Sequence, residues 1–230
     1  MEPDQNITTE VVKTQQNPHV SIGDSIAKMK LAFDNALWHE IFEPMQTVGY
    51  TEEKITGMKG SLTHLESLQQ VQIKEYAEQF AETEKFDLKR TEIDELYTRQ
   101  KALAKILFKG NVHAQTILLL LDAKPKAYSA WVQQITNFYA QLTAPELIAK
   151  ATPVGITVVS VAAQKQGLAD LQALKDSQRK ETAEAQQATE TRDAAFDQLY
   201  PLYSEYIKYA KIMLAGNQML EAIGVKVKKK

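Results

Sequence analysis

Histidine spacing is the first place to look for a metal or acid–base site in this chain. The histidines are His19, His39, His64 and His113. A di-iron centre in a helical bundle needs a glutamate three residues before a histidine that faces the core. The residues at those positions are Gln16, Ala36, Ser61 and Gly110, so the pattern predicts no di-metal centre of this type.

His39 and Glu40 resemble half of the zinc-binding helix motif of metalloproteases. Glu43 stands where that motif has its second histidine, so we interpret the segment as a polar helix face. The chain also lacks cysteine, a glycine-rich phosphate loop, a nucleophile elbow and a dinucleotide fingerprint. We therefore assign no catalytic, metal-binding or cofactor-binding residue, and expect no cofactor, no small-molecule substrate and no enzymatic activity.

Acidic residues are dense between positions 75 and 95. They are Glu75, Glu78, Glu82, Glu84, Asp87, Glu92, Asp94 and Glu95. A catalytic carboxylate pair needs an apolar pocket that separates the two pKa values. Lysine and arginine residues are interleaved with these acids, which indicates a solvated helix face.

A ladder of tyrosines recurs at every third residue near the C-terminus: Tyr200, Tyr203, Tyr206 and Tyr209. Side chains at every third residue follow a line that winds slowly around the helix, so they produce a broad aromatic surface. We favour packing against neighbouring helices with the hydroxyls at the rim. Docking of a protein partner stays open as the alternative.

Segment 154–161 is rich in β-branched apolar residues, namely Val154, Ile156, Val158, Val159 and Val161. Such a run could contact a membrane, as in helical pore-forming toxins. The equivalent stretch in the first half of the chain contains Glu52, Glu53 and Lys54. We therefore favour a helix start that joins the core, with membrane contact as the alternative.

The composition argues against a partner that recognises this protein through its overall charge. The 230 residues include 27 Lys and Arg against 29 Asp and Glu, which gives a net charge of −2. A nucleic-acid-binding domain is typically alkaline with a basic stripe, so we expect no nucleic-acid partner. Neither a secretory signal nor an apolar run of about 20 residues is visible, so a cytoplasmic location is the default expectation.

An internal duplication is the most informative feature of the sequence. At an offset of 106 residues, positions 47–117 align without a gap with positions 153–223, and 23 of the 71 aligned pairs are identical. Composition alone would give about 5 identities. Two copies of one supersecondary unit are therefore expected.

Each copy has the apolar spacing of a long helix. Between Ser61 and Lys109 there is no glycine or proline, and the apolar residues follow spacings of three and four: Leu62, Leu65, Leu68, Ile73, Tyr76, Phe80, Ile93, Leu96, Leu103 and Ile106. Gly110-Asn111 and Gly216-Asn217 are typical of left-handed C-terminal caps. We favour continuous helices over helices bent near residues 84–90, although Pro201 could kink or restart the second helix.

A shorter amphipathic helix is expected before each long one, over Asp24–Phe42 and about 126–142. Segment 145–153 is interpreted as an insertion or short helix peculiar to the second half. The predicted fold is all-α: an elongated helical bundle with two long antiparallel helices. Its expected parts are a mobile segment 1–21, repeats 22–123 and 124–225 packed as one domain, and a basic tail 226–230.

Three segments near the C-terminus resemble a family of uncharacterised, mostly helical proteins found notably in the Bacteroidota. They are Gln187–Ala195, Tyr209–Ile212 and Leu220–Val225. The resemblance implies a long-helix fold and no known activity, so it supplies no catalytic residues.

Three functional hypotheses follow. The leading one is a non-catalytic helical interaction or scaffold protein that binds a protein partner or self-associates. The second is a membrane-associated helical protein of pore-forming-toxin type. The third is an enzyme whose site the sequence does not reveal.

Overall fold

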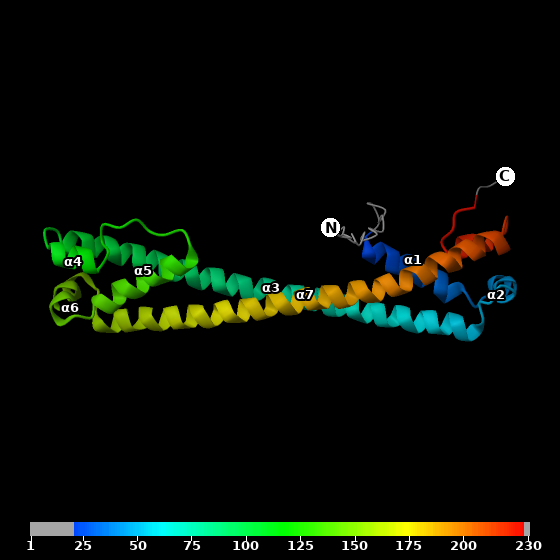
Figure 1. Ribbon diagram of the computed structural model, residues 1–230, viewed down its shortest axis with the longest axis horizontal. Helices are drawn as coiled ribbons and strands as arrows, with labels where there is room; N and C mark the ends of the chain where they lie inside the picture. Colours follow the sequence, from blue (N-terminus) through cyan, green and yellow to red (C-terminus); the bar gives the residue numbers. More distant parts are fainter. Residues whose placement is uncertain (1–20, 228–230) are drawn as a thin grey trace, which may run out of the picture. The chain divides into compact units, whose positions relative to one another are not determined.

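A computed structural model describes residues 21–227, and every regular element in that range is a helix (Figure 1). The elements are α1 (Ile22–Asn35), α2 (His39–Gln46), α3 (Glu52–Leu107), α4 (Val112–Ile117), α5 (Tyr128–Gln141), α6 (Pro145–Ala151), the 3₁₀ turn η1 (Thr152–Val154), α7 (Val158–Met213) and α8 (Met219–Ala222). The all-α prediction is confirmed. The expectations for residues 1–20 and for Lys228, Lys229 and Lys230 lie outside the described residues.

The chain forms two compact units that do not coincide with the two sequence repeats. Unit 1 contains residues 1–69 and 191–230, and unit 2 contains residues 70–190. Each unit therefore takes one part of α3 and one part of α7. Each repeat contributes residues to both units.

The two long helices are continuous. Each has 56 residues, which corresponds to about 84 Å of helix at 1.5 Å per residue. The helix α7 runs through Pro201 without a break. Within unit 2, Thr83 contacts Gln178, and the side chain of Ile93 lies beside Gly167. The residue numbers rise in one helix as they fall in the other, so the two helices are antiparallel there.

The caps of the long helices occupy matching places in the two copies. Thr51 and Thr157 accept hydrogen bonds from the backbone of Lys54 and Ser160 at the starts of α3 and α7. After the helices end, Gly110 and Gly216 have φ values of +84° and +80°. This left-handed conformation strains residues with a Cβ, which explains why a glycine follows each long helix.

Residues 145–153 include the short helix α6, but it is not peculiar to the second half, because the duplication extends over the shorter helices as well. Moving Ile22–Asn35 by 106 residues gives Tyr128–Gln141, so α1 matches α5, and α2 likewise matches α6. The predicted first helix therefore ends at Asn35, and its last residues belong to the separate helix α2. Aligned pairs such as Met29 with Ile135 and Phe33 with Tyr139 are fully buried in both copies.

Each unit has one hydrophobic core. In unit 1, α1, α2, α8 and the adjacent parts of α3 and α7 bury a cluster that includes Phe33, Ile41 and Tyr206. In unit 2, the corresponding elements bury Tyr97, Trp131 and Phe138.

Candidate functional site

One side of α3 in unit 2 carries large apolar side chains that are only partly covered by the described chain. Ile73 is 52% exposed, Tyr76 36%, Phe80 66% and Leu88 65%. Because their spacings are three, four and eight residues, the four side chains lie on one face of the helix. We call these four residues the α3 stripe. Three of them were among the apolar residues whose spacing predicted the helix, and that spacing did not indicate that they would be exposed.

The second copy shows that the fold does not require apolar residues at these positions. The residues 106 positions later in α7 are Arg179, Thr182, Gln186 and Ala194. Arg179, Gln186 and Ala194 are exposed, and Thr182 is half-buried. Because α7 folds with polar or small residues there, burial in the core does not explain the apolar residues of α3.

The surroundings of the α3 stripe combine small residues with unpaired acids. Ala77 and Ala81 flank Phe80 and are exposed. A surface hollow of about 400 Å³ beside Phe80 and Leu88 is also lined by Glu84 and Asp87. Neither carboxylate has an ion-pair partner within residues 21–227. The stripe is thus an apolar ridge with small residues and free negative charges beside it.

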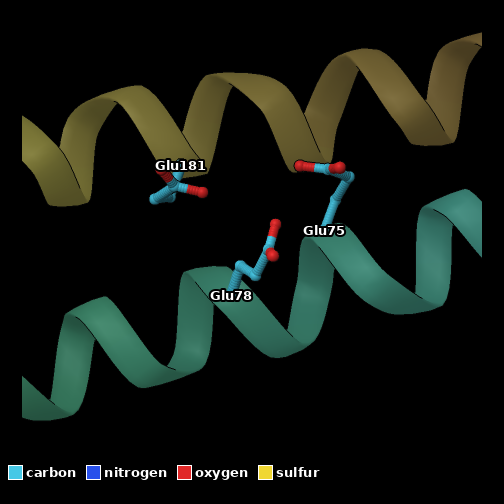
Figure 2. A group of neighbouring side chains, drawn as sticks. All are labelled: Glu75, Glu78 and Glu181. Carbon is cyan, nitrogen blue, oxygen red and sulfur yellow. The ribbon is translucent and has the colours of Figure 1, made fainter.

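A cluster of carboxylates lies close to the stripe, between the two long helices (Figure 2). Glu75 and Glu78 from α3 and Glu181 from α7 each place a carboxylate oxygen within 4.8 Å of the other two. This arrangement could supply three oxygen ligands to a divalent cation. Sequence analysis noted the two glutamates of α3 but not Glu181, because nothing along the chain indicated that the helices would face each other there.

Lysines already balance the charge of this cluster. Lys74 contacts Glu75 at 3.6 Å and Glu78 at 3.1 Å. The duplicated residue Lys180 contacts Glu181 at 3.5 Å and Glu184 at 3.0 Å. The same ion-pair arrangement therefore occurs once on each helix.

We expect divalent cations to leave the stability of the protein nearly unchanged. A cation at the carboxylates would have to displace or repel the two ammonium groups, and ligand stabilisation scales with the logarithm of concentration over Kd. In thermal unfolding followed by circular dichroism, millimolar Mg²⁺ or Ca²⁺ should shift Tm by less than about 1 °C. A shift of several degrees that Glu181→Gln abolishes would contradict this expectation.

The tyrosine ladder divides between core and surface. Tyr206 is fully buried, Tyr203 is half-buried, and Tyr200 and Tyr209 are about two-fifths exposed. Phe33 and Tyr50 contact the Tyr206 ring edge-on, with centroid distances of 6.1 Å and 5.1 Å. Packing therefore accounts for Tyr206, and the exposed surface of the ladder is limited to its other members.

The apolar run at the start of α7 is divided in the same way. Ile156 and Val161 are buried in the core of unit 2, whereas Val154, Val158 and Val159 are exposed. Within the described residues, no single helix has the length and apolar character needed to cross a membrane. One bent pair does meet the criterion by length and composition, namely Pro145–Val154 with Val158–Met213, at an angle of 99°.

One feature of the sequence indicates the α3 stripe without the structure. Comparing the two copies position by position shows apolar residues in α3 where α7 has Arg179, Thr182 and Gln186. A core position is rarely occupied by arginine, so these pairs mark a face that the fold leaves in solvent.

Comparison of the chain with protein-family models, with curated proteins and with solved structures gives no match.

Proposed function

We propose that this chain is a non-catalytic helical interaction protein, and that the α3 stripe binds the same stripe of a second copy. The observation that carries the proposal is the difference between the copies: α3 keeps large apolar side chains where α7 has polar or small ones. Exposed apolar surface that the fold does not need is typical of an interaction site.

The sizes and charges of the residues around the α3 stripe favour an antiparallel pairing with the α3 helix of a second copy. If Ala81 lies opposite Phe80 of the second copy, the large ring packs over small residues on both sides. The same register brings Ile73 opposite Leu88 and Lys74 opposite Asp87. Lys74 then faces the Asp87 carboxylate in addition to Glu75 and Glu78 of its own helix, and the arrangement is self-complementary, as a two-fold interface requires.

The contact is expected to be of moderate affinity. Ile73 and Leu88 are 15 residues apart, which is about 22 Å along the helix. Four apolar side chains from each copy form a patch at the small end of specific interfaces. We therefore expect a dissociation constant of about 1–100 μM.

Transplanting the residues of the second copy tests this proposal. The variant carries Ile73→Arg, Tyr76→Thr, Phe80→Gln and Leu88→Ala, which are the residues that α7 has at the equivalent positions. Sedimentation velocity over a wide concentration range should show dimerisation of the wild type and at least about 100-fold weaker association of the variant. Its circular dichroism should stay that of the wild type, because α7 folds with the same residues.

Two controls distinguish association through the α3 stripe from non-specific hydrophobic association. Ile106→Thr removes an apolar side chain that is 75% exposed elsewhere on α3, and should leave association unchanged. Because the chain has no cysteine, Ala81→Cys should form an intermolecular disulfide on oxidation, whereas Ala102→Cys should not. A wild type that stays monomeric at millimolar concentration, or equal dimerisation of the four-residue variant, would disprove the proposal.

A further inference from the structure

The corner between α6 and α7 in unit 2 carries exposed apolar side chains. Pro145–Val154 and Val158–Met213 meet there at an angle of 99° (Figure 1). Four exposed apolar residues follow in the first two turns of α7, and spacings of three and four place them on one side of the helix: Val158, Val159, Ala162 and Ala163. Val158 is 63% exposed and Val159 78%. We call these four residues the corner patch.

The first copy shows that the start of a long helix does not require this patch. The equivalent residues of α3, 106 positions earlier, are exposed as well and are Glu52, Glu53, Thr56 and Gly57. Acidic side chains stabilise the first turn of a helix through its dipole, so two valines there forgo a local gain in stability. Folding therefore does not account for the valines, and exposed apolar surface of this kind indicates contact with something outside the chain.

The part of the chain that surrounds the corner patch is basic. Residues 101–165 contain seven lysines against two carboxylates, a net charge of +5, whereas the whole chain carries −2. The side chain of Ile93 lies beside Gly167, and the same antiparallel register places residues 101–105 of α3 level with residues 155–159. The lysines at the end of α3 are therefore close to the start of α7.

Four lysines near this corner are exposed and form no ion pair with any described residue. They are Lys105, Lys109, Lys150 and Lys165. Lys150 lies in the last turn of α6, and Lys165 follows Ala162 by three residues on α7. Their charges are available to an anionic partner, because no carboxylate of the described chain neutralises them.

Most of the remaining apolar character of this corner is used by the core. Within the described residues, α6 with η1 and α7 form the one bent helix pair that has the length and composition of a membrane span. Several of its apolar side chains are nevertheless buried in the core of unit 2, namely Leu147, Ala151, Ile156 and Val161. An association that keeps the fold intact therefore uses the exposed patch and lies at a membrane surface.

We propose that the corner patch docks on the surface of an anionic lipid bilayer. Val158 and Val159 enter the boundary between headgroups and acyl chains, and the neighbouring lysines lie at the level of the anionic headgroups. Exposed apolar residues flanked by lysines are typical of helices that bind in the membrane interface. The residues outside 101–165 carry a net charge of −7, so the same surface repels them and orients the protein. This docking does not depend on pairing of the α3 stripe.

Co-sedimentation of the full chain with vesicles tests the proposal. The vesicles are phosphatidylcholine with or without about 30% phosphatidylglycerol, and the protein is kept below about 1 μM, where pairing of the α3 stripe does not contribute. At about 0.1 M salt, binding to the anionic vesicles should be at least about 10-fold tighter than binding to the neutral ones. Raising the salt to about 0.5 M should remove most of this difference, because the Debye length falls to about 4 Å.

Exchanging the valines for the residues of the first copy identifies the apolar contact. Val158→Glu with Val159→Glu should weaken binding to anionic vesicles at least about 10-fold and leave the circular dichroism unchanged, because α3 begins with the same residues. Val158→Gln with Val159→Gln keeps the charge of the protein and should still weaken binding at least about 5-fold, because apolar contact is lost. Ile212→Gln, at a 71% exposed position of unit 1, should change binding by less than about 2-fold.

Exchange of lysines identifies the electrostatic contact. Lys150→Gln with Lys165→Gln should weaken binding at least about 10-fold at about 0.1 M salt, because each lysine near an anionic surface strengthens binding about 5-fold. Lys28→Gln with Lys208→Gln removes two exposed lysines of unit 1 and should change binding by less than about 2-fold.

Two results would overturn the proposal. One is a wild type that does not bind the anionic vesicles at about 1 mM lipid, and the other is a double glutamate variant that binds them like the wild type. Self-association that Val158→Glu with Val159→Glu abolishes, without any vesicle binding, would assign the corner patch to contact with a second copy instead.

Discussion

Replacing Tyr206 by alanine is expected to lower the free energy of unfolding by about 3–5 kcal/mol, the usual cost of deleting a buried aromatic ring. The ring is fully buried in the core of unit 1 and packs edge-on against Phe33 and Tyr50. Its neighbours come from different parts of the chain, so little local collapse can fill the space. Urea denaturation followed by circular dichroism at 222 nm measures the loss.

The hydroxyl group of Tyr206 should make no favourable contribution to the free energy of unfolding. It is buried without a hydrogen-bond partner in the described chain, and burial raises the pKa of Tyr206, so the group stays neutral. Tyr206→Phe should therefore be neutral or stabilising by up to about 1 kcal/mol. Tyr139→Phe is the matched comparison, because the Tyr139 hydroxyl donates to Gln100 Oε1 at 2.7 Å. That variant should lose about 1–2 kcal/mol. Equal effects of the two substitutions would contradict this account.

Asp94 is expected to contribute about 2–3 kcal/mol to stability, because it accepts two hydrogen bonds that join three segments of unit 2. Trp131 Nε1 of α5 donates to its Oδ1 at 2.7 Å, and Lys124 Nζ, in the segment before α5, donates to its Oδ2 at 2.6 Å. Asp94→Ala leaves a largely buried indole N–H without its acceptor. Asp170→Asn is the control: this exposed carboxylate accepts a hydrogen bond from Gln166 on the same helix, and its loss should cost less than about 0.5 kcal/mol.

The contribution of Asp94 should also depend on pH. Burial acts to raise the pKa of Asp94, but the hydrogen bonds from Lys124 and Trp131 outweigh it and hold the pKa below its ordinary value of 3.8. A carboxyl whose pKa is lowered by folding stabilises the protein above its ordinary pKa, and this stabilisation is lost as the pH falls through the lowered value. The difference in unfolding free energy between wild type and Asp94→Asn should therefore be constant near neutral pH and shrink below about pH 4. A difference that does not change between pH 7 and pH 3 would contradict the assignment.

The long helices were predictable because their signals are local. Apolar spacing, the absence of glycine and proline, and the glycine after each helix all depend on neighbours within about one turn. Pro201 left the continuity of α7 open, and the structure shows one helix from Val158 to Met213. The duplication was equally visible over residues 47–117 and 153–223, where identities are frequent.

The shorter helices show where sequence comparison failed. Residues 22–46 and 128–152 share one identical pair, Glu40 with Glu146, among 25 aligned positions. The structure nevertheless buries equivalent positions in both copies, such as Ala32 with Phe138 and Ala36 with Leu142. Cores tolerate such exchanges when neighbouring side chains adjust in volume, so burial is retained while identity is lost.

The candidate sites depended even more on tertiary structure. The sequence by itself determined that the chain is helical, that it is duplicated and where its long helices end, because helix periodicity and capping are properties of neighbouring residues. It could not determine which apolar residues of α3 are covered, since periodicity places Phe80 and Ile93 on a helix but does not say where another helix lies. The packing of α7 and α5 decided that Ile93 is buried and Phe80 exposed, and that Glu181 lies beside Glu75. Each of these facts joins residues that are far apart in sequence, and contacts of that kind exist only once the helices have packed.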